Sequence, residues 1–323
     1  MIEEAPFFTV LLLTYNSDWV KTKQTLLSII EQENVSFEIV ISDDGSKENN
    51  SDKIIHFFEE NNFTKYKIVQ NQNNQGTVQN ILSGLKVVSG EFVKPISPGD
   101  FFYSKDSLKK AYDYILKDNK QAAAYFGRTA YYSLNDNKTI IQTGLSHPHD
   151  ICPYQKQNYR KIKRNYFIRH DTILGASVIY HTEAFKNHLL NLSDFVKFAE
   201  DYSLISILAS NQKIKLITNE TNTEDFFIWY ESATGISTQK QSKWHGILYS
   251  ELEKTFRYLY ENKLISHNIY DSNFSSSKIK RFSIHITKDT FFYIKNKLIK
   301  TKSIGFDNLN PDSSFLTHLL EVK

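Results

Sequence analysis

The chain has 323 residues, of which 40% are hydrophobic and 14% aromatic, and its formal net charge is +3. This size and composition suit one large core with a smaller appendage, and a charge so close to zero gives no sign of a nucleic-acid-binding surface. Cys152 is the single cysteine, which excludes an intramolecular disulfide and a cysteine-based zinc site.

The sequence shows no segment typical of export or of membrane insertion. Residues 1–6 are acidic and short, unlike a signal peptide. No apolar run approaches the roughly 20 residues that span a bilayer. Lysine far exceeds arginine, as in AT-rich bacterial genomes. We expect a bacterial, cytoplasmic protein, with peripheral contact at the inner face of the plasma membrane as an open alternative.

The first half alternates strand patterns with amphipathic helix patterns. Strands are predicted over residues 7–13, 37–41, 66–69 and 91–96, and helices over 19–31, 50–60, 77–88 and 105–116. Such alternation indicates βαβ units. The predicted fold class is therefore α/β, with a mainly parallel central sheet flanked by helices.

The second half is more mixed. Strands are predicted over 123–127, 139–141 and 174–180, and a short helix begins at Thr182. Residues 147–170 are polar, basic and aromatic, and we expect an irregular segment there, which in a compact domain is often functional. From about residue 240 the pattern is helical and basic, with helices over 244–261 and 278–302. We expect a main domain over 1–240 and a C-terminal helical extension over 241–323.

Polar residues follow the ends of three predicted strands. These segments are Thr14-Tyr15-Asn16, Asp43-Asp44-Gly45-Ser46 and Ser97-Pro98-Gly99-Asp100. Carboxyl ends of parallel strands meet at one edge of a sheet, where open α/β folds bind ligands. We therefore expect these segments to share a site.

Two further segments carry residue types that suit chemistry. Asn74-Gln75-Gly76 and Asn80 surround a helix start, where the glycine permits close backbone approach and the helix N-terminus favours phosphate. An ordinary turn with a helix cap is the alternative. Glu200-Asp201 opens a later amphipathic run. A positioned carboxylate can serve as a general base, whereas an acid pair that stabilises the helix N-terminus is the alternative.

In this order the segments resemble glycosyltransferase family 2, an inverting family with the GT-A fold. The resemblance covers residues 6–240 and makes 1–240 the GT-A catalytic domain. It implies transfer of a sugar from a nucleotide-diphosphate donor, a UDP-sugar first, to an acceptor hydroxyl. Family frequency suggests a role in bacterial cell-surface polysaccharide or glycoconjugate synthesis.

The resemblance also assigns roles. Asp201 is implied as the catalytic base, with Glu200 as the neighbour that orients it. Tyr15 is implied to lie against the base of the nucleotide, Asp44 to accept from the uracil imide, and Asp43 to bind the donor or to orient the turn. The full set implied to bind the donor is Thr14, Tyr15, Asn16, Asp43, Asp44, Asn74, Gly76, Asn80, Ser97 and Gly99.

The segment 97–100 departs from the family pattern, which has two or three aspartates there for a metal ion. This chain keeps Asp100, with Ser97 and Gly99 at the other acidic positions. Magnesium often takes one or two carboxylates together with substrate phosphates. We expect Asp100 to hold a divalent cation, Mn2+ or Mg2+, carried by the diphosphate, and the dependence on metal to be weaker.

Three segments are candidates for the acceptor side. Trp229, Gly235, Ser237 and Thr238 resemble the family's late loop, which closes over the diphosphate and acceptor; a plain connector is the alternative. Arg160 and Lys163, in the basic segment 147–170, would meet an anionic acceptor or be merely solvated. The basic, aromatic helix over 278–302 would contact a membrane surface, or pack on the catalytic domain or on a second subunit in a homodimer.

Two rival functions stay open. One is a glycosyltransferase acting on Ser or Thr of a protein acceptor, such as a surface adhesin. The other is a nucleotide-sugar-binding protein without catalysis, which the depleted segment 97–100 suggests. The expected partners are a nucleotide-sugar donor and a carbohydrate, lipid-linked or protein acceptor, without nucleic acid.

Overall fold

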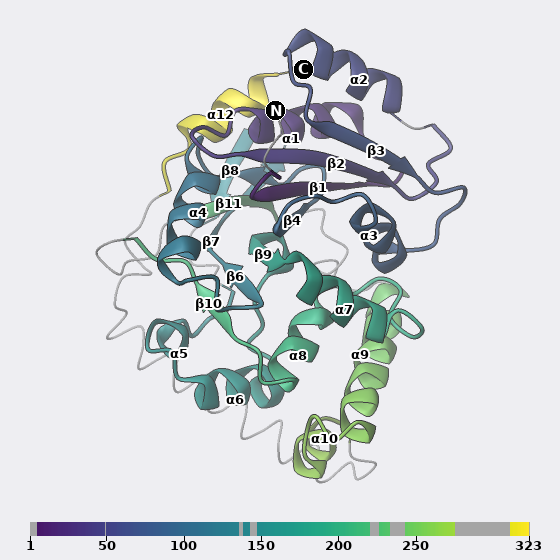
Figure 1. Ribbon diagram of the computed structural model, residues 1–323, viewed down its shortest axis with the longest axis vertical. Helices are drawn as coiled ribbons and strands as arrows, with labels where there is room; N and C mark the ends of the chain where they lie inside the picture. Colours follow the sequence, from purple (N-terminus) through teal and green to yellow (C-terminus); the bar gives the residue numbers. More distant parts are fainter. Residues whose placement is uncertain are drawn as a thin grey trace.

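The computed structural model describes residues 5–48, 50–135, 138–142, 147–219, 226–232, 243–274 and 311–322 (Figure 1). This part of the chain contains a seven-stranded sheet in the order β10-β6-β9-β4-β1-β2-β3. Its strands are β1 (Phe8–Thr14), β2 (Phe37–Asp43), β3 (Tyr66–Gln70), β4 (Phe92–Ile96), β6 (Ala124–Phe126), β9 (Val178–His181) and β10 (Ile214–Leu216). β9 runs antiparallel to β4 and β6, and the other neighbours are parallel. The predicted α/β fold with a mainly parallel sheet is confirmed.

Helices cover both faces of this sheet. They are α1 (Trp19–Ile30), α2 (Ser51–Glu60), α3 (Thr77–Leu85), α4 (Ser107–Lys117), α7 (Thr182–Leu192) and α8 (Tyr202–Ala209). Val10 and Leu12 of β1 pack in a cluster with α1, α2 and α4, whereas Leu11 and Leu13 pack on the opposite face with α3, α7 and α8. Every residue of β1 and β2 is therefore buried. This explains why both strands are continuous apolar runs in the sequence.

A second sheet lies beside the first. Its strands are β5 (Phe101–Phe102), β11 (Phe226–Glu231), β7 (Arg128–Asn135) and β8 (Lys138–Gln142), in that order across the sheet. The C-terminal helix α12 (Ser314–Glu321) packs Leu316 and Leu319 against Trp229 of β11. Through this packing α12 covers the second sheet, whose strand β5 directly follows the 97–100 turn.

Two expectations for the second half are wrong. Residues 147–170 are not irregular: they contain α5 (Cys152–Gln155) and α6 (Tyr159–Arg169). Ile162, Tyr166 and Phe167 form a buried face of α6, and Pro153 sits in the first turn of α5, where proline is tolerated. Within the strand expected over 174–180, Gly175–Ser177 form a 3₁₀ turn and β9 begins at Val178.

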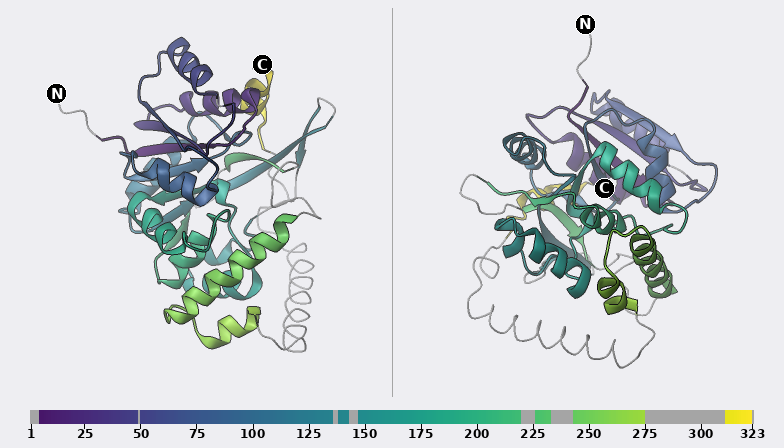
Figure 2. Two further views of the ribbon diagram at one scale, coloured as in Figure 1. Left: turned by 90° about the vertical axis from the view of Figure 1, so that its right-hand side faces the viewer. Right: turned by 60° about the horizontal axis from the view of Figure 1, so that its bottom comes forward.

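The later helices pack onto the same cores. α9 (Lys243–Glu261) buries Phe256 and Leu259 in the cluster shared by α3, α7 and α8, and α10 (His267–Phe274) follows it. Figure 2 shows α9 and α10 at the opposite end of the molecule from α12. The helix predicted over 278–302 lies outside the described residues. Within the described residues, every helix is too short or too polar to cross a membrane.

Candidate active site

The loops after β1 and β2 are bonded to each other. Thr14 Oγ1 donates to Asp43 Oδ2 at 2.9 Å, and the Asn16 backbone N–H donates to Ser46 Oγ at 2.7 Å. Asn16 Oδ1 in turn accepts from the backbone N–H of Lys47. Tyr15 is left 47% exposed at this edge, so its ring is accessible to a ligand.

Asp43 and Asp44 are both buried and both accept several hydrogen bonds from the chain. Asp43 accepts from Thr14 and from the backbone N–H and hydroxyl of Ser46, and so shapes the turn. Asp44 accepts from Asn71 Nδ2 at 3.1 Å and from the backbone N–H groups of Gln75 and Gly76 at 2.9 and 2.8 Å. Asp44 therefore organises the loop before α3.

Of the residues expected around the start of α3, Asn74 is exposed and Gly76 has φ +94° at the helix N-cap. Asn80 is a correction. It is buried, its Nδ2 donates to the carbonyl of Ser42 at 2.9 Å, and its Oδ1 accepts from Ser42 Oγ at 2.8 Å. Position 80 lies one turn into α3, where the side chain meets β2, so Asn80 secures the helix to the sheet.

The turn after β4 is held by side chains from two other elements, Thr25 of α1 and Tyr132 of β7. Ser97, the first residue of the turn, is exposed. Gly99 has φ +99°, its N–H donates to Thr25 Oγ1 at 3.0 Å, and its carbonyl accepts from the Tyr132 hydroxyl at 2.6 Å. Asp100 follows and is buried. Burial raises the pKa of Asp100 to about 7, and the positive charge of Lys94 opposes this rise.

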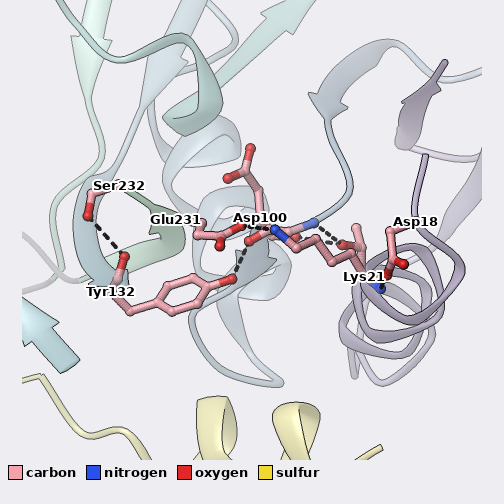
Figure 3. A network of polar contacts seen from close by, with 8 residues as sticks. Asp18, Lys21, Asp100, Tyr132, Glu231 and Ser232 are labelled. Atoms are coloured by element: carbon pink, nitrogen blue, oxygen red, sulfur yellow. Dashed lines mark hydrogen bonds and ion pairs between the residues drawn. The ribbon is translucent and has the colours of Figure 1, made fainter. Parts of the chain in front are cut away.

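An ion pair lies beside this turn (Figure 3). Lys21 of α1 places its Nζ 2.6 Å from Oε2 of Glu231, the last residue of β11. The backbone N–H of Glu231 also bonds to the Asp100 carboxylate. Three chain segments thus meet at the 97–100 turn, although neither Lys21 nor Glu231 is singled out by the sequence.

The residues around Asp100 do not make a metal site on their own. Within the described parts of the chain, no three His, Cys, Asp or Glu side chains converge as metal ligands. Asp100 is the one acid of the 97–100 turn, and the nearby carboxylate of Glu231 is paired with Lys21. An ion bound here would depend on oxygens that a ligand brings.

Asp201 precedes α8 and is partly buried with Glu200. Burial raises the pKa of Asp201 to about 6, offset by the backbone N–H of Gly175 and the charge of Lys94. Burial and the Asp201 charge raise the pKa of Glu200 to about 8. At neutral pH Asp201 is therefore the more ionised member. Its Oδ1 is buried and accepts no hydrogen bond from the described residues.

Lys94 interacts electrostatically with both acidic groups, Asp100 and Asp201, although no sequence motif points to it. It is fully buried on β4, and its Nζ donates to the carbonyls of Pro95 and, at 2.8 Å, Ala176. Burial lowers the pKa of Lys94 to about 7, whereas the charges of Asp100 and Asp201 raise it. A lysine within the apolar strand Phe92–Ile96 was the available signal.

Glu251 was also missed. Its carboxylate, on α9, accepts the backbone N–H groups of Lys197, Phe198 and Ala199 at 2.9, 3.2 and 3.1 Å. These residues directly precede Glu200, so α9 holds the segment that presents the acid pair. Fifty residues separate the two in sequence, and no local pattern connects them.

Three of the acceptor-side candidates, Trp229, Arg160 and Lys163, lie in the described part of the chain, and they lie away from this edge. Trp229 is a correction: it is fully buried in β11 and stacks on Tyr103, because the pattern read as a loop is a strand. Lys163 donates to Asn211, just beyond the C-terminus of α8, whereas Asp201 lies before its N-terminus. Eight helical residues span about 12 Å, so Lys163 is remote from Asp201. Arg160 is exposed on the same helix, α6; Gly235, Ser237 and Thr238 lie outside the described residues.

The chain is similar in sequence to known proteins. The sequence profile of glycosyl transferase family 2 matches residues 9–189. An uncharacterized glycosyltransferase of Rickettsia conorii is 24% identical over 263 residues, which are 74% of this chain. The chain spans 40% of the length of that relative.

Two solved structures share the fold. S. aureus TarS 1–349 in complex with UDP-GlcNAc has a TM-score of 0.55 and 21% identity, and the match covers 86% of this chain and 75% of that one. The mannosyltransferase PcManGT from Pyrobaculum calidifontis, in complex with GDP-Man and Mn2+, has a TM-score of 0.53 and 13% identity, with coverage of 98% and 80%. At these identities the likeness shows a common fold, the GT-A arrangement.

Proposed function

Because the chain belongs to glycosyl transferase family 2, we propose that it transfers a sugar from a nucleotide-diphosphate donor to an acceptor hydroxyl with inversion. Structures of similar fold contain UDP-GlcNAc in one case and GDP-Man in another. We favour a UDP-sugar as donor. The acceptor we propose is a glycan or lipid-linked sugar of a bacterial cell surface.

The observation that carries this proposal is the pairing of two acidic centres through Lys94. Asp100 lies at the turn after β4 and Asp201 at the start of α8, and the buried ammonium of Lys94 is within electrostatic reach of both. A single displacement requires a base on one side of the transferred sugar and a site for the leaving group on the other. Burial raises the pKa of both Asp201 and Glu200, and we propose Asp201, the acid within reach of the Lys94 charge, as the base.

The proposed step follows from these positions. The acceptor oxygen forms a bond to the anomeric carbon while the bond from that carbon to the diphosphate oxygen breaks. The proton of the acceptor hydroxyl passes to Asp201, and the electron pair of the broken bond leaves with the diphosphate. Attack opposite to the leaving group converts an α-linked donor into a β-linked product.

The donor base is proposed to lie against Tyr15, with Asn16, Asn74 and Ser97 accessible along the same edge. A divalent cation, Mn2+ or Mg2+, would arrive with the diphosphate and meet Asp100. The similar mannosyltransferase structure contains Mn2+, which supports the ion as a cofactor.

A donor screen tests the proposal. The full chain is incubated with UDP-, dTDP- and GDP-sugars and simple glycoside acceptors, with and without Mn2+, and released nucleotide is measured. Release from one donor class that is lost in Asp201→Asn is the expected result. Release that is unchanged in Asp201→Asn would refute the role of the base.

A nucleotide-sugar-binding protein without catalysis is the second candidate, because the 97–100 turn carries one acid. Absence of release from every donor, with UDP binding still measurable by calorimetry, would favour this candidate. Transfer to a peptide instead of a glycoside would identify the protein-acceptor alternative.

A further inference from the structure

Lys21 places a positive charge at the turn where this chain lacks two acids. We propose that the Lys21 ammonium, oriented by Glu231, binds the diphosphate of the donor. It would supply positive charge that a metal ion held by the missing acids would otherwise provide. This inference rests on the proposed transfer from a nucleotide-diphosphate donor.

The first support is the space above Gly99. A Cβ atom built on Gly99 would lie 3.0 Å from Glu231 Oε2 and 3.7 Å from Lys21 Cδ. A side chain at position 99 would therefore run into the ion pair. The Lys21–Glu231 pair thus lies where an acidic side chain at position 99 would project.

The second support is the location of the charge on its helix. Lys21 lies in the first turn of α1, where Asp18 caps the helix. The helix dipole disfavours a positive charge at that end, so stability of the helix does not explain a lysine here. Asp18 already accepts the backbone N–H of Lys21 at this end, so a phosphate group here would be held by the Lys21 ammonium and not by a free helix N-terminus.

The third support is accessibility. The Lys21 side chain is 33% exposed, whereas that of Glu231 is 7% exposed. The buried carboxylate fixes the ammonium, which remains open to solvent on one side. An ammonium has three N–H donors, and Glu231 Oε2 accepts one. Lysine is also a common phosphate ligand, acting as a point charge.

An ion pair that merely joins α1 to β11 is the competing explanation, and two variants separate the two. Lys21→Met removes the ammonium, whereas Glu231→Gln removes the same pair but keeps the ammonium. If the pair only joins the elements, both variants should lose UDP binding to a similar extent. If Lys21 binds diphosphate, Glu231→Gln should lose less UDP affinity than Lys21→Met, because the ammonium is kept and a negative charge has left the site.

The experiment is calorimetry of UDP binding to the full chain, in EDTA and in Mn2+. We expect wild type to bind UDP in EDTA, and Lys21→Met to bind about tenfold more weakly, with a smaller deficit in Mn2+. Lys105→Met is the matched control, since it breaks the Lys105–Glu31 ion pair at the other end of α1. Thermal melting verifies that each variant is folded.

Three results would overturn the inference. The first is equal UDP affinity of wild type and Lys21→Met in EDTA. The second is an equal loss of UDP affinity in Lys21→Met and Glu231→Gln. The third is that wild type binds UDP when Mn2+ is present but not in EDTA. Failure of wild type to bind any of UDP, dTDP and GDP under both conditions would instead refute the proposed donor function, and the role of Lys21 with it.

Discussion

Gly175 shows how tightly the chain packs around the proposed base. A Cβ atom built there would lie 1.7 Å from Asp201 Oδ1. The turn that carries Gly175 is also held by Lys94 through the carbonyl of Ala176. The orientation of Asp201 therefore depends on residues that contribute no acid or base of their own to the transfer.

We predict that Gly175→Ala lowers kcat by about 100-fold, because a displacement of about 1 Å near the reacting atoms can cost that much. Initial rates at saturating donor measure this. Gly246→Ala is the control, since a Cβ atom there meets no atom within 4 Å. A kcat close to wild type in Gly175→Ala would contradict the assignment of Asp201.

The raised pKa of Asp201 predicts how activity depends on pH. A base must be ionised, so kcat/KM, which reports the pKa values of the free enzyme, should rise with pH through about 6, the pKa of Asp201. A pH–rate profile for the donor identified above measures this. Asp194→Asn, a substitution of an exposed acid seven residues earlier, should keep the profile. A profile that falls with rising pH in this range would exclude Asp201 as the base.

The free energy of unfolding should change with pH in the opposite direction to the activity. Folding raises the Asp201 pKa from 3.8 to about 6, so the folded state favours the protonated form. Its contribution to the free energy of unfolding falls as pH rises from about 4 to about 6. Asp201→Asn removes this loss, and we expect it to melt higher than wild type at neutral pH while losing activity. A lower melting temperature would show that the charge stabilises the fold.

At the scale of elements, α9 belongs structurally to the site. Glu251 accepts three consecutive backbone N–H groups ahead of the acid pair, and Tyr202 of α8 donates its hydroxyl to the carbonyl of Leu248. On the other side of the loop, the carbonyl of Lys197 accepts the N–H of Val78 in α3. The segment before the acid pair is thus held between α3, beside the loops proposed to bind the donor, and α9.

We predict that Glu251→Gln lowers the free energy of unfolding by about 1.5–3 kcal/mol, the usual range for hydrogen bonds to a charged group. It should also lower kcat more than it changes the donor KM, because the segment before Asp201 loosens. Chemical denaturation and steady-state kinetics measure the two effects. Glu253→Gln, which breaks the exposed pair with Arg257 on the same helix, should change neither. Equal effects of both substitutions would refute a special role for Glu251.

The sequence predicted an element well where the residue pattern within that element determines its structure, and poorly where contacts with distant residues determine it. β1 and β2 are apolar throughout because helices cover both their faces, and both begin within one residue of the predicted position. α6 was missed because its basic residues conceal a narrow buried face made by Ile162, Tyr166 and Phe167. The strand expected from residue 174 begins at Val178, because Gly175–Ser177 turn beneath Asp201.

The candidate site divides in the same way. Tyr15 and Asp44 could be named as candidates because each directly follows a strand, and Asp100 because it closes the turn after β4. Lys21 and Glu251 could not, since their meaning comes from partners 210 and about 53 residues away. Asn80 has the residue type of a ligand, but its place on the inner face of α3 decides its role.

At the scale of the whole molecule, the segments beyond the family match complete the site. The match ends at residue 189, whereas Asp201, Glu231 and Glu251 all follow it. α12 also supports this part of the molecule. It packs against the second sheet, and Gln24 Nε2 of α1 donates to the carbonyl of Val322 at 3.0 Å. The last helix therefore braces both elements that carry the Lys21–Glu231 pair.

This arrangement predicts that α12 supports donor binding from a distance. Leu319 is fully buried with Trp229 and Tyr132, and Tyr132 donates its hydroxyl to the carbonyl of Gly99. We expect Leu319→Ala to lower the free energy of unfolding by about 2–5 kcal/mol. It should also weaken UDP binding, because the support of the 97–100 turn and of Glu231 loosens.

Urea denaturation and calorimetry with UDP measure these effects, with Thr317→Ala as the control on the exposed side of α12. The two readouts together identify the cause. A loss of stability with unchanged UDP affinity would mean that α12 closes the core but does not brace the turn. A loss of affinity at a temperature where Leu319→Ala is still fully folded would instead mean that the second sheet transmits the packing of α12 to Gly99.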